Sequence, residues 1–198
     1  MTRPVRIHPV TLRFDDAALE ERFREQYRAS ATRQVRVTLL IGAVLFLAFI
    51  LVDRWADPDL ALRAWPVRIG VAAVFLASLA LTWSTWWPRI RGRVLWIAAL
   101  VAAVGMCALI AIGGPWVELR WVGLVLVALG ADTLLRLAFP AILVLSAAYL
   151  AIWPATLAIA GGLTWDRAIG GWIALGSAFA IGLLAAYTIE RYARRSFL

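Results

Sequence analysis

Hydrophobic residues dominate six long runs of this chain, and short polar segments separate them. Each run has roughly 17 to 24 residues and few charges. A helix of about 20 residues crosses the roughly 30 Å hydrocarbon core of a bilayer, because it rises about 1.5 Å per residue. The pattern therefore predicts an all-α polytopic membrane protein, with a six-transmembrane-helix bundle over residues 35–189. The predicted spans are 35–52, 67–86, 94–113, 119–135, 140–160 and 168–189.

The polar residues before the first span predict an amphipathic cytoplasmic helix within residues 1–34. This segment lacks the apolar core of a signal peptide. Asp15 is expected to cap the helix, and Phe14 is expected to pack on Leu19. Apolar residues four apart define one face, which would lie on the inner leaflet or pack on a partner helix. Because no helix breaker occurs before Gly42, we expect the helix to continue into the first span.

The last span leads without glycine or proline into a charged segment, residues 190–198. Glu190 and Arg194 lie four positions apart, where opposite charges on a helix support one another. We therefore predict that this helix leaves the membrane and continues as a cytoplasmic extension.

Composition excludes a water-soluble domain. The chain of 198 residues is 63% hydrophobic and 16% charged, with a mean hydropathy of +0.82, which is unlike soluble domains. Its formal net charge is +8, and all 20 basic residues are arginines that cluster at the ends of predicted spans. Such clustering indicates contact with lipid headgroups rather than with nucleic acid.

The distribution of the arginines also orients the chain. With both termini in the cytoplasm, the cytoplasmic segments hold 15 arginines and the outer segments hold five. Cytoplasmic loops of membrane proteins carry an excess of basic residues. The lack of lysine beside abundant arginine, alanine and leucine is typical of a GC-rich bacterial genome. We therefore predict a multi-pass protein of the bacterial inner membrane with both termini inside.

Small residues recur at every fourth position of the last span. Such a row lets another helix backbone approach closely. Two interpretations are open: a dimer interface with a second copy, continued by Glu190 and Arg194 as a coupling segment, or packing against a helix of the same chain. The row consists of Gly170, Ala174, Ala178, Gly182 and Ala186.

Two pairs of charged residues lie in or near the predicted spans, where an isolated charge is costly. Asp132 and Arg136 are four positions apart and are expected to pair on one helix face. That pair is either self-contained at the interface or a cytoplasmic coupling point. Asp53 and Arg68 lie at the outer ends of the first two spans, where antiparallel helices would bring them into a structural salt bridge.

The sequence shows none of the usual catalytic patterns. His8 is the sole histidine and Cys107 the sole cysteine, so we expect no haem ligation, zinc site or histidine-based triad. We expect no cofactor, no metal and no catalysis within these residues. Aromatic and charged residues near the outer boundary form either a membrane-interface belt or a sensing surface. They are Trp55, Trp65, Arg68, Trp116, Glu118, Arg120, Trp165 and Asp166.

Both ends of the chain together resemble a known family. The opening segment LRFDDAALEERFR (12–24), Asp53, Arg68 and the exit segment YTIERYARRSFL (187–198) resemble the N-terminal six-helix membrane domain of bacterial class III adenylate/guanylate cyclases. Related domains precede diguanylate cyclase and histidine kinase modules. The resemblance implies that residues 190–198 begin a signalling helix leading to a dimeric cytoplasmic catalytic domain. It also implies that this chain is either an excised domain or a stand-alone relative, because the catalytic aspartates have no counterpart here.

These observations favour a sensory and dimerising membrane domain that acts on a cytoplasmic effector, expected to be a nucleotide cyclase. Its expected partners are the lipid bilayer, a second copy of the chain and that effector. A small transporter or channel is one alternative, and it predicts solute flux that depends on Asp132 or Arg136. A plain membrane anchor or assembly subunit is another, and it predicts that the outer loops are dispensable.

Overall fold

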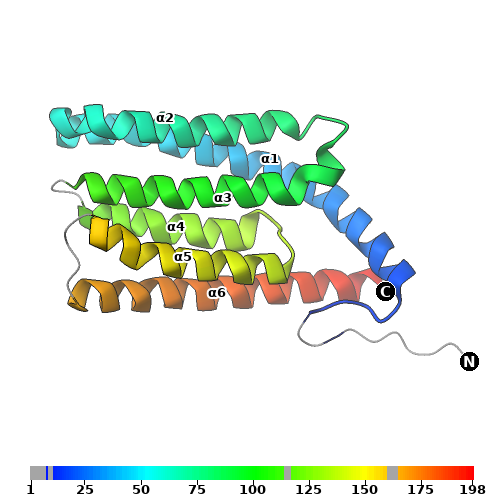
Figure 1. Ribbon diagram of the computed structural model, residues 1–198. Helices are drawn as coiled ribbons and strands as arrows, with labels where there is room; N and C mark the ends of the chain where they lie inside the picture. The colour runs from blue at the N-terminus through cyan, green and yellow to red at the C-terminus, as the bar shows by residue number, and fades with distance from the viewer. Residues whose placement is uncertain (1–7, 9–10, 114–116, 160–164) are drawn as a thin grey trace, which may run out of the picture.

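The computed structural model describes residues 8, 11–113, 117–159 and 165–198, and the regular structure within these ranges is entirely α-helical. The helices form an elongated bundle (Figure 1). They are α1 (Ala17–Ala56), α2 (Pro58–Leu81), α3 (Trp87–Ile112), α4 (Val117–Leu134), α5 (Phe139–Ile159) and α6 (Trp165–Phe197).

Five of these helices are long and apolar enough to cross a membrane: α1, α2, α3, α5 and α6. The corresponding apolar part of α4 is shorter, Val122–Leu134. Large apolar side chains such as Val44 and Leu184 point away from the bundle and are exposed, as expected where lipid rather than water surrounds the helices. Within the described residues, the fold is therefore that of a helical membrane protein.

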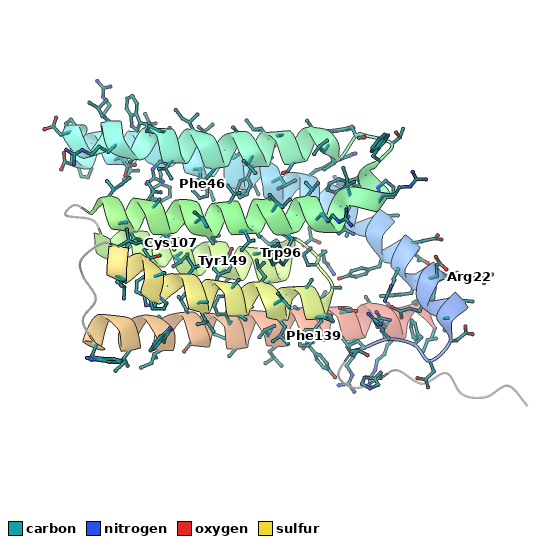
Figure 2. All side chains as sticks on the ribbon, viewed as in Figure 1. Arg22, Phe46, Trp96, Cys107, Phe139 and Tyr149 are labelled. Carbon is teal, nitrogen blue, oxygen red and sulfur yellow. The ribbon has the colours of Figure 1, made fainter. Side chains whose placement is uncertain are left out.

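Helix α3 lies between the α1–α2 pair and the group formed by α4, α5 and α6 (Figure 1). Small residues on α3, including Ala98 and Ala102, are completely buried and allow the neighbouring helices to approach. Tyr149 on α5 points toward α3, and its hydroxyl donates a hydrogen bond of 2.9 Å to the Ala99 carbonyl (Figure 2). The hydrogen bond gives this phenol a partner in an apolar interior.

The first and last helices project beyond the rest of the bundle at the same end (Figure 1). Helix α1 has 40 residues and runs without interruption through the predicted first span, as the absence of a breaker before Gly42 indicated. Helix α6 has 33 residues and continues through the predicted exit segment. The start of α1 and the end of α6 therefore lie side by side.

The helix start near Asp15 differs from the prediction. Asp16 is the N-cap, and its Oδ1 atom accepts hydrogen bonds from the backbone N–H groups of Ala18 and Leu19 at 2.9 and 3.3 Å. The Phe14 ring packs against Phe23 and, at the end of α6, against Phe197. Phe14 thus makes a long-range contact that the sequence did not predict.

Helix α2 begins earlier than predicted. Residues 58–66, which lie between the first two predicted spans, are helical, and α2 ends at Leu81 rather than at residue 86. Pro58 occupies the first helical position, where the missing N–H would have no helical partner anyway. The Asp57 side chain accepts a hydrogen bond from the Asp59 N–H at 3.1 Å. The turn-forming residues here end α1 and start α2 within two positions, with no longer loop between the helices.

Candidate functional site

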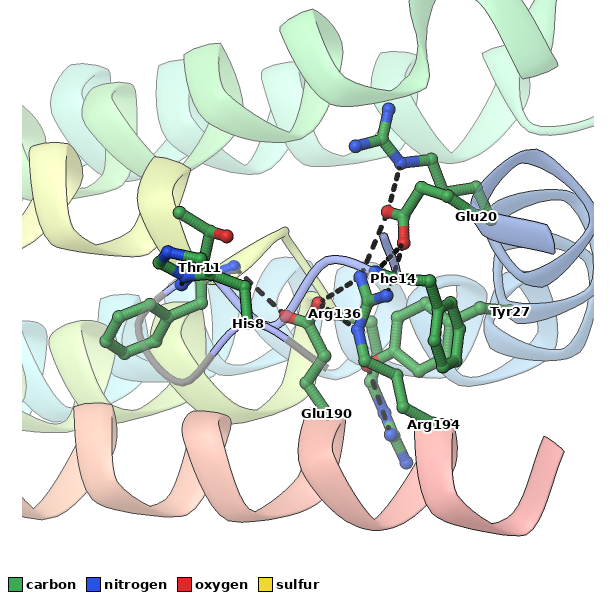
Figure 3. A network of polar contacts seen from close by, with 10 residues as sticks. His8, Thr11, Phe14, Glu20, Tyr27, Arg136, Glu190 and Arg194 are labelled. Carbon is green, nitrogen blue, oxygen red and sulfur yellow. Dashed lines mark hydrogen bonds and ion pairs between the residues drawn. The ribbon is translucent and has the colours of Figure 1, made fainter. Parts of the chain in front are cut away.

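Three buried charged side chains connect the start of α1 to the end of α6. They are Glu20, Glu190 and Arg194, and none is more than 7% exposed. We call these three residues the terminal charge cluster (Figure 3). Charged residues are seldom buried unless they are paired, so this cluster marks a specific connection between the two ends of the chain.

Arg194 lies at the centre of the cluster and binds both carboxylates. Its Nη1 and Nη2 atoms donate to the two Glu20 oxygens at 2.5 and 3.2 Å, a bidentate arrangement that fixes the guanidinium plane. Its Nε and Nη2 atoms donate to Glu190 Oε1 at 3.1 and 2.8 Å. The predicted Glu190–Arg194 pair is thus present, but it is one half of a larger network.

Aromatic rings enclose the Arg194 guanidinium. Its central carbon lies 4.3 Å from the centre of the Phe23 ring and 5.2 Å from that of Phe14. Phe197 packs against both rings, with centroid separations of 5.5 and 6.3 Å. These rings attract the cation and shield the ion pairs from water, which strengthens the connection between α1 and α6.

The hydrogen bonds of the cluster hold Glu20 in its ionised form. Burial alone would raise the pKa of Glu20, but hydrogen bonds from Arg194, the Phe14 backbone N–H and Arg24 outweigh it and lower this pKa from 4.5 to about 2. Burial would lower the pKa of Arg194, whereas its hydrogen bonds with Glu20 and Glu190 raise it. Glu20 and Arg194 are therefore both charged near neutral pH.

The connection between α4 and α5 joins the same end of the bundle. The Phe139 N–H donates to Glu190 Oε2 at 3.2 Å. Arg136 donates to the side chains of Gln34 at 3.0 Å and Tyr27 at 3.4 Å, both on α1. Polar contacts therefore link the last turns of α6, the first half of α1 and the α4–α5 connection (Figure 3).

The predicted pairing of Asp132 with Arg136 is wrong. Helix α4 ends at Leu134, and Arg136 adopts a left-handed backbone conformation with φ of 51°. The two residues therefore no longer share a helix face. Arg136 turns to α1, while Asp132 is 2% exposed and neither of its carboxyl oxygens has a hydrogen-bond partner among the described residues.

The row of small residues on α6 lies partly inside the chain. Ala178, Gly182 and Ala186 are buried, and Gly182 faces Asp132 of α4 so closely that an added Cβ would lie 2.6 Å from the Asp132 Oδ2 atom. Gly170 and Ala174, nearer the start of α6, are exposed. The buried three residues pack within the chain, so they are not available as the predicted surface for a second copy.

Asp53 and Arg68 meet at the opposite end of the bundle. The Arg68 Nε and Nη2 atoms donate to the two Asp53 carboxylate oxygens at 2.5 and 3.1 Å, and both side chains are buried. The Phe49 ring lies 5.2 Å from the Arg68 guanidinium carbon. The predicted salt bridge is therefore present and links α1 to α2. The pair also lines an apolar cavity of about 440 Å³ between α1, α3 and α4.

The residues that were considered as an outer sensing surface are only partly described. Trp55 and Trp165 are 82% and 78% exposed, as in an aromatic belt at a membrane interface. The side chains of Trp116, Glu118, Arg120 and Asp166 lie outside those that the structure describes. No grouping of three or more potential metal ligands occurs in the part of the chain that the structure describes.

Sequence reasoning missed the role of Glu20. Its partner Arg194 lies 174 positions away, and no local pattern predicts such a contact. The available signal was the pair Glu20 and Arg24, four positions apart and bonded at 2.7 Å.

Comparison with known protein families, curated proteins and solved structures finds no match.

Proposed function

We propose that this chain is a membrane-embedded sensory or regulatory domain with six membrane crossings, both ends in the cytoplasm, and α6 as its output helix. The observation that carries the proposal is the terminal charge cluster. Helix α6 extends beyond the bundle without interruption, and its final turns are held by α1 through buried, charged contacts. A change inside the membrane that moves α6 would act on these contacts.

The strength of the cluster is suitable for a switch. Removing one partner from a buried ion pair typically costs about 3–5 kcal/mol. Shifting a two-state equilibrium from about 1:99 to 99:1 takes about 5.5 kcal/mol. Opening or closing the cluster thus supplies much of the free energy that separates a held from a released exit helix.

The proposed effector is a cytoplasmic nucleotide cyclase that works as a dimer, and it is inferred from the resemblance of the two chain ends to cyclase membrane domains. Two output helices that leave the membrane side by side would set the spacing or rotation of two catalytic halves. This arrangement requires a homodimer, whose contact surface would exclude the buried residues of the small-residue row.

A fusion experiment tests the proposal. Residues 1–198 are joined to a dimer-dependent cyclase catalytic domain, and cyclic nucleotide production is measured in bilayers for Arg194→Gln and for the matched control Arg195→Gln. Arg195 is the exposed neighbour of Arg194, so its replacement removes the same charge without opening the cluster. We expect output to change several-fold in Arg194→Gln alone. Equal output from the two variants at equal expression would contradict the proposal.

A further inference from the structure

Asp132 differs from the other buried charged residues in the amount of support it receives. The ion pairs at the two ends of the bundle satisfy Asp53, Glu20 and Glu190, whereas neither Asp132 oxygen has a hydrogen-bond partner among the described residues. An ionised carboxyl buried without a partner inside a membrane domain is costly. A neutral carboxylic acid avoids most of this cost.

Among the described residues, no positively charged side chain forms a hydrogen bond with Asp132. From α6 it faces Gly182, with Ala178 and Ala186 one turn away on either side. From α5 it interacts electrostatically with Tyr149, whose hydroxyl donates to the Ala99 carbonyl. Other titratable or charged groups on the neighbouring elements have described contacts of their own. Cys107 on α3 lies near Tyr149, Arg91 on α3 donates to the Arg136 carbonyl, and Arg136 donates to Gln34. Tyr187 on α6 packs against Phe139, and Glu190 on α6 pairs with Arg194.

We propose that Asp132 is a proton-binding site that controls the packing of α6 against α4. With the proton bound, the neutral carboxyl fits beside Gly182. Loss of the proton to water leaves a carboxylate between two closely packed apolar helix faces, and the electron pair stays on the carboxyl oxygens. The ionised form then favours separation of α6 from α4, because separation admits water to the charge.

A buried row of residues, which winds gradually around α6, connects the contact with Asp132 to the terminal charge cluster. Ala178, Gly182, Ala186, Glu190 and Arg194 follow one another at intervals of four, and all are buried. Because α6 is one uninterrupted helix over this range, a displacement at Gly182 is carried along it to Arg194. This inference rests on the proposed function only in naming α6 as the output helix; proton binding itself stands independently.

The test uses the full chain in lipid bilayers, with carboxyl-¹³C aspartate and infrared spectroscopy between pH 5 and 9. We expect a carboxylic acid band at neutral pH that is lost as the pH rises, and we expect Asp132→Asn to lack it. The wild-type titration needs no variant, so it remains informative if Asp132→Asn fails to fold. A neutral-pH wild-type spectrum without a protonated aspartate band would overturn the proposal.

A distance measurement tests the coupling to α6. Spin labels are placed at the exposed positions Leu126 on α4 and Ile181 on α6, with Cys107 replaced by alanine. The distance should shift with pH over the range in which the infrared band is lost, and Asp132→Asn should keep the low-pH distance throughout. A pH-independent wild-type distance, or an unchanged shift in Asp132→Asn, would overturn the coupling. These readouts contain no effector, so failure of the cyclase fusion would contradict the proposed function and leave proton binding intact.

Discussion

Replacing Arg194 with glutamine removes the central cation of the terminal charge cluster and leaves Glu20 and Glu190 buried without it. Arg194 makes four hydrogen bonds to these two carboxylates, and its side chain is 4% exposed. Leaving a buried charge unpaired costs about 3–5 kcal/mol. The pKa of Glu20, lowered from 4.5 to about 2 by Arg194, the Phe14 N–H and Arg24 together, corresponds to at most roughly 3–4 kcal/mol for all these partners, and to less after solvent screening.

Hydrogen–deuterium exchange of the full chain in lipid nanodiscs measures this loss locally. A stability loss of about 3 kcal/mol corresponds to an increase in exchange rate on the order of 100-fold. The increase should be confined to amides near residues 20–27 and 190–197, while α3 stays protected. Adding Glu20→Gln to Arg194→Gln should restore part of the protection, because the double variant no longer leaves the Glu20 charge buried without its main partner.

Arg195→Gln provides the control, since Arg195 is exposed on the same helical turn. Its effect should be below about 0.5 kcal/mol, as for other surface substitutions. If Arg194→Gln and Arg195→Gln exchange at the same rates near both chain ends, the cluster does not hold α6 and the reasoning is refuted.

Three further predictions concern stability. Because the folded-state pKa of Glu20 is below its unfolded value of 4.5, the stabilisation is present above pH 4.5 and is lost as the pH falls toward 2; exchange protection at the chain ends should therefore be constant from pH 7 to 5, and a loss already at pH 6 would count against it. Gly182→Ala should lower the free energy of unfolding by about 1–3 kcal/mol through overpacking against Asp132. Gly176→Ala, whose added Cβ meets nothing within 4 Å, should change this free energy by less than about 1 kcal/mol. Denaturation in detergent compares the two variants, and equal losses would be inconsistent with the close approach of α4 and α6. Arg68→Leu should destabilise the protein by about 3–5 kcal/mol and Arg68→Leu with Asp53→Leu by less; a thermal unfolding series in which the double variant is the less stable one would contradict a buried pair.

The sequence predicted the helices better than their ends. Long apolar runs must become helices in a bilayer, because every backbone polar group needs an internal partner, and the absence of breakers correctly indicated the continuity of α1 and α6. The predicted start of the second span at residue 67 was too late, because proline is compatible with the first turn of a helix and α2 begins at Pro58. A proline near a helix boundary is compatible both with a loop and with the first turn of the helix, so it does not fix where the helix begins.

The site was less predictable, because its contacts join distant parts of the chain. The pairing of Glu190 with Arg194 follows from their spacing, but the pairing of Arg194 with Glu20 depends on how the whole bundle brings α1 and α6 together. Asp132 and Arg136 show the opposite error. Their spacing is correct for a pair, but α4 ends two residues too early and Arg136 finds partners on α1. Local periodicity does not report where a helix stops.

The most direct test of the account is the position of the two chain ends relative to each other in a bilayer. Spin labels at the exposed positions Arg22 and Ser196, with Cys107 replaced by alanine, report this distance in the otherwise intact chain. We predict one narrow distance distribution in the wild type and a broad one in Arg194→Gln. The cysteines introduced at positions 22 and 196 for labelling should both react with a reagent applied from the cytoplasmic side only. A broad wild-type distribution, or labelling of the two sites from opposite sides of the membrane, would contradict the claim that α1 holds the exit of α6.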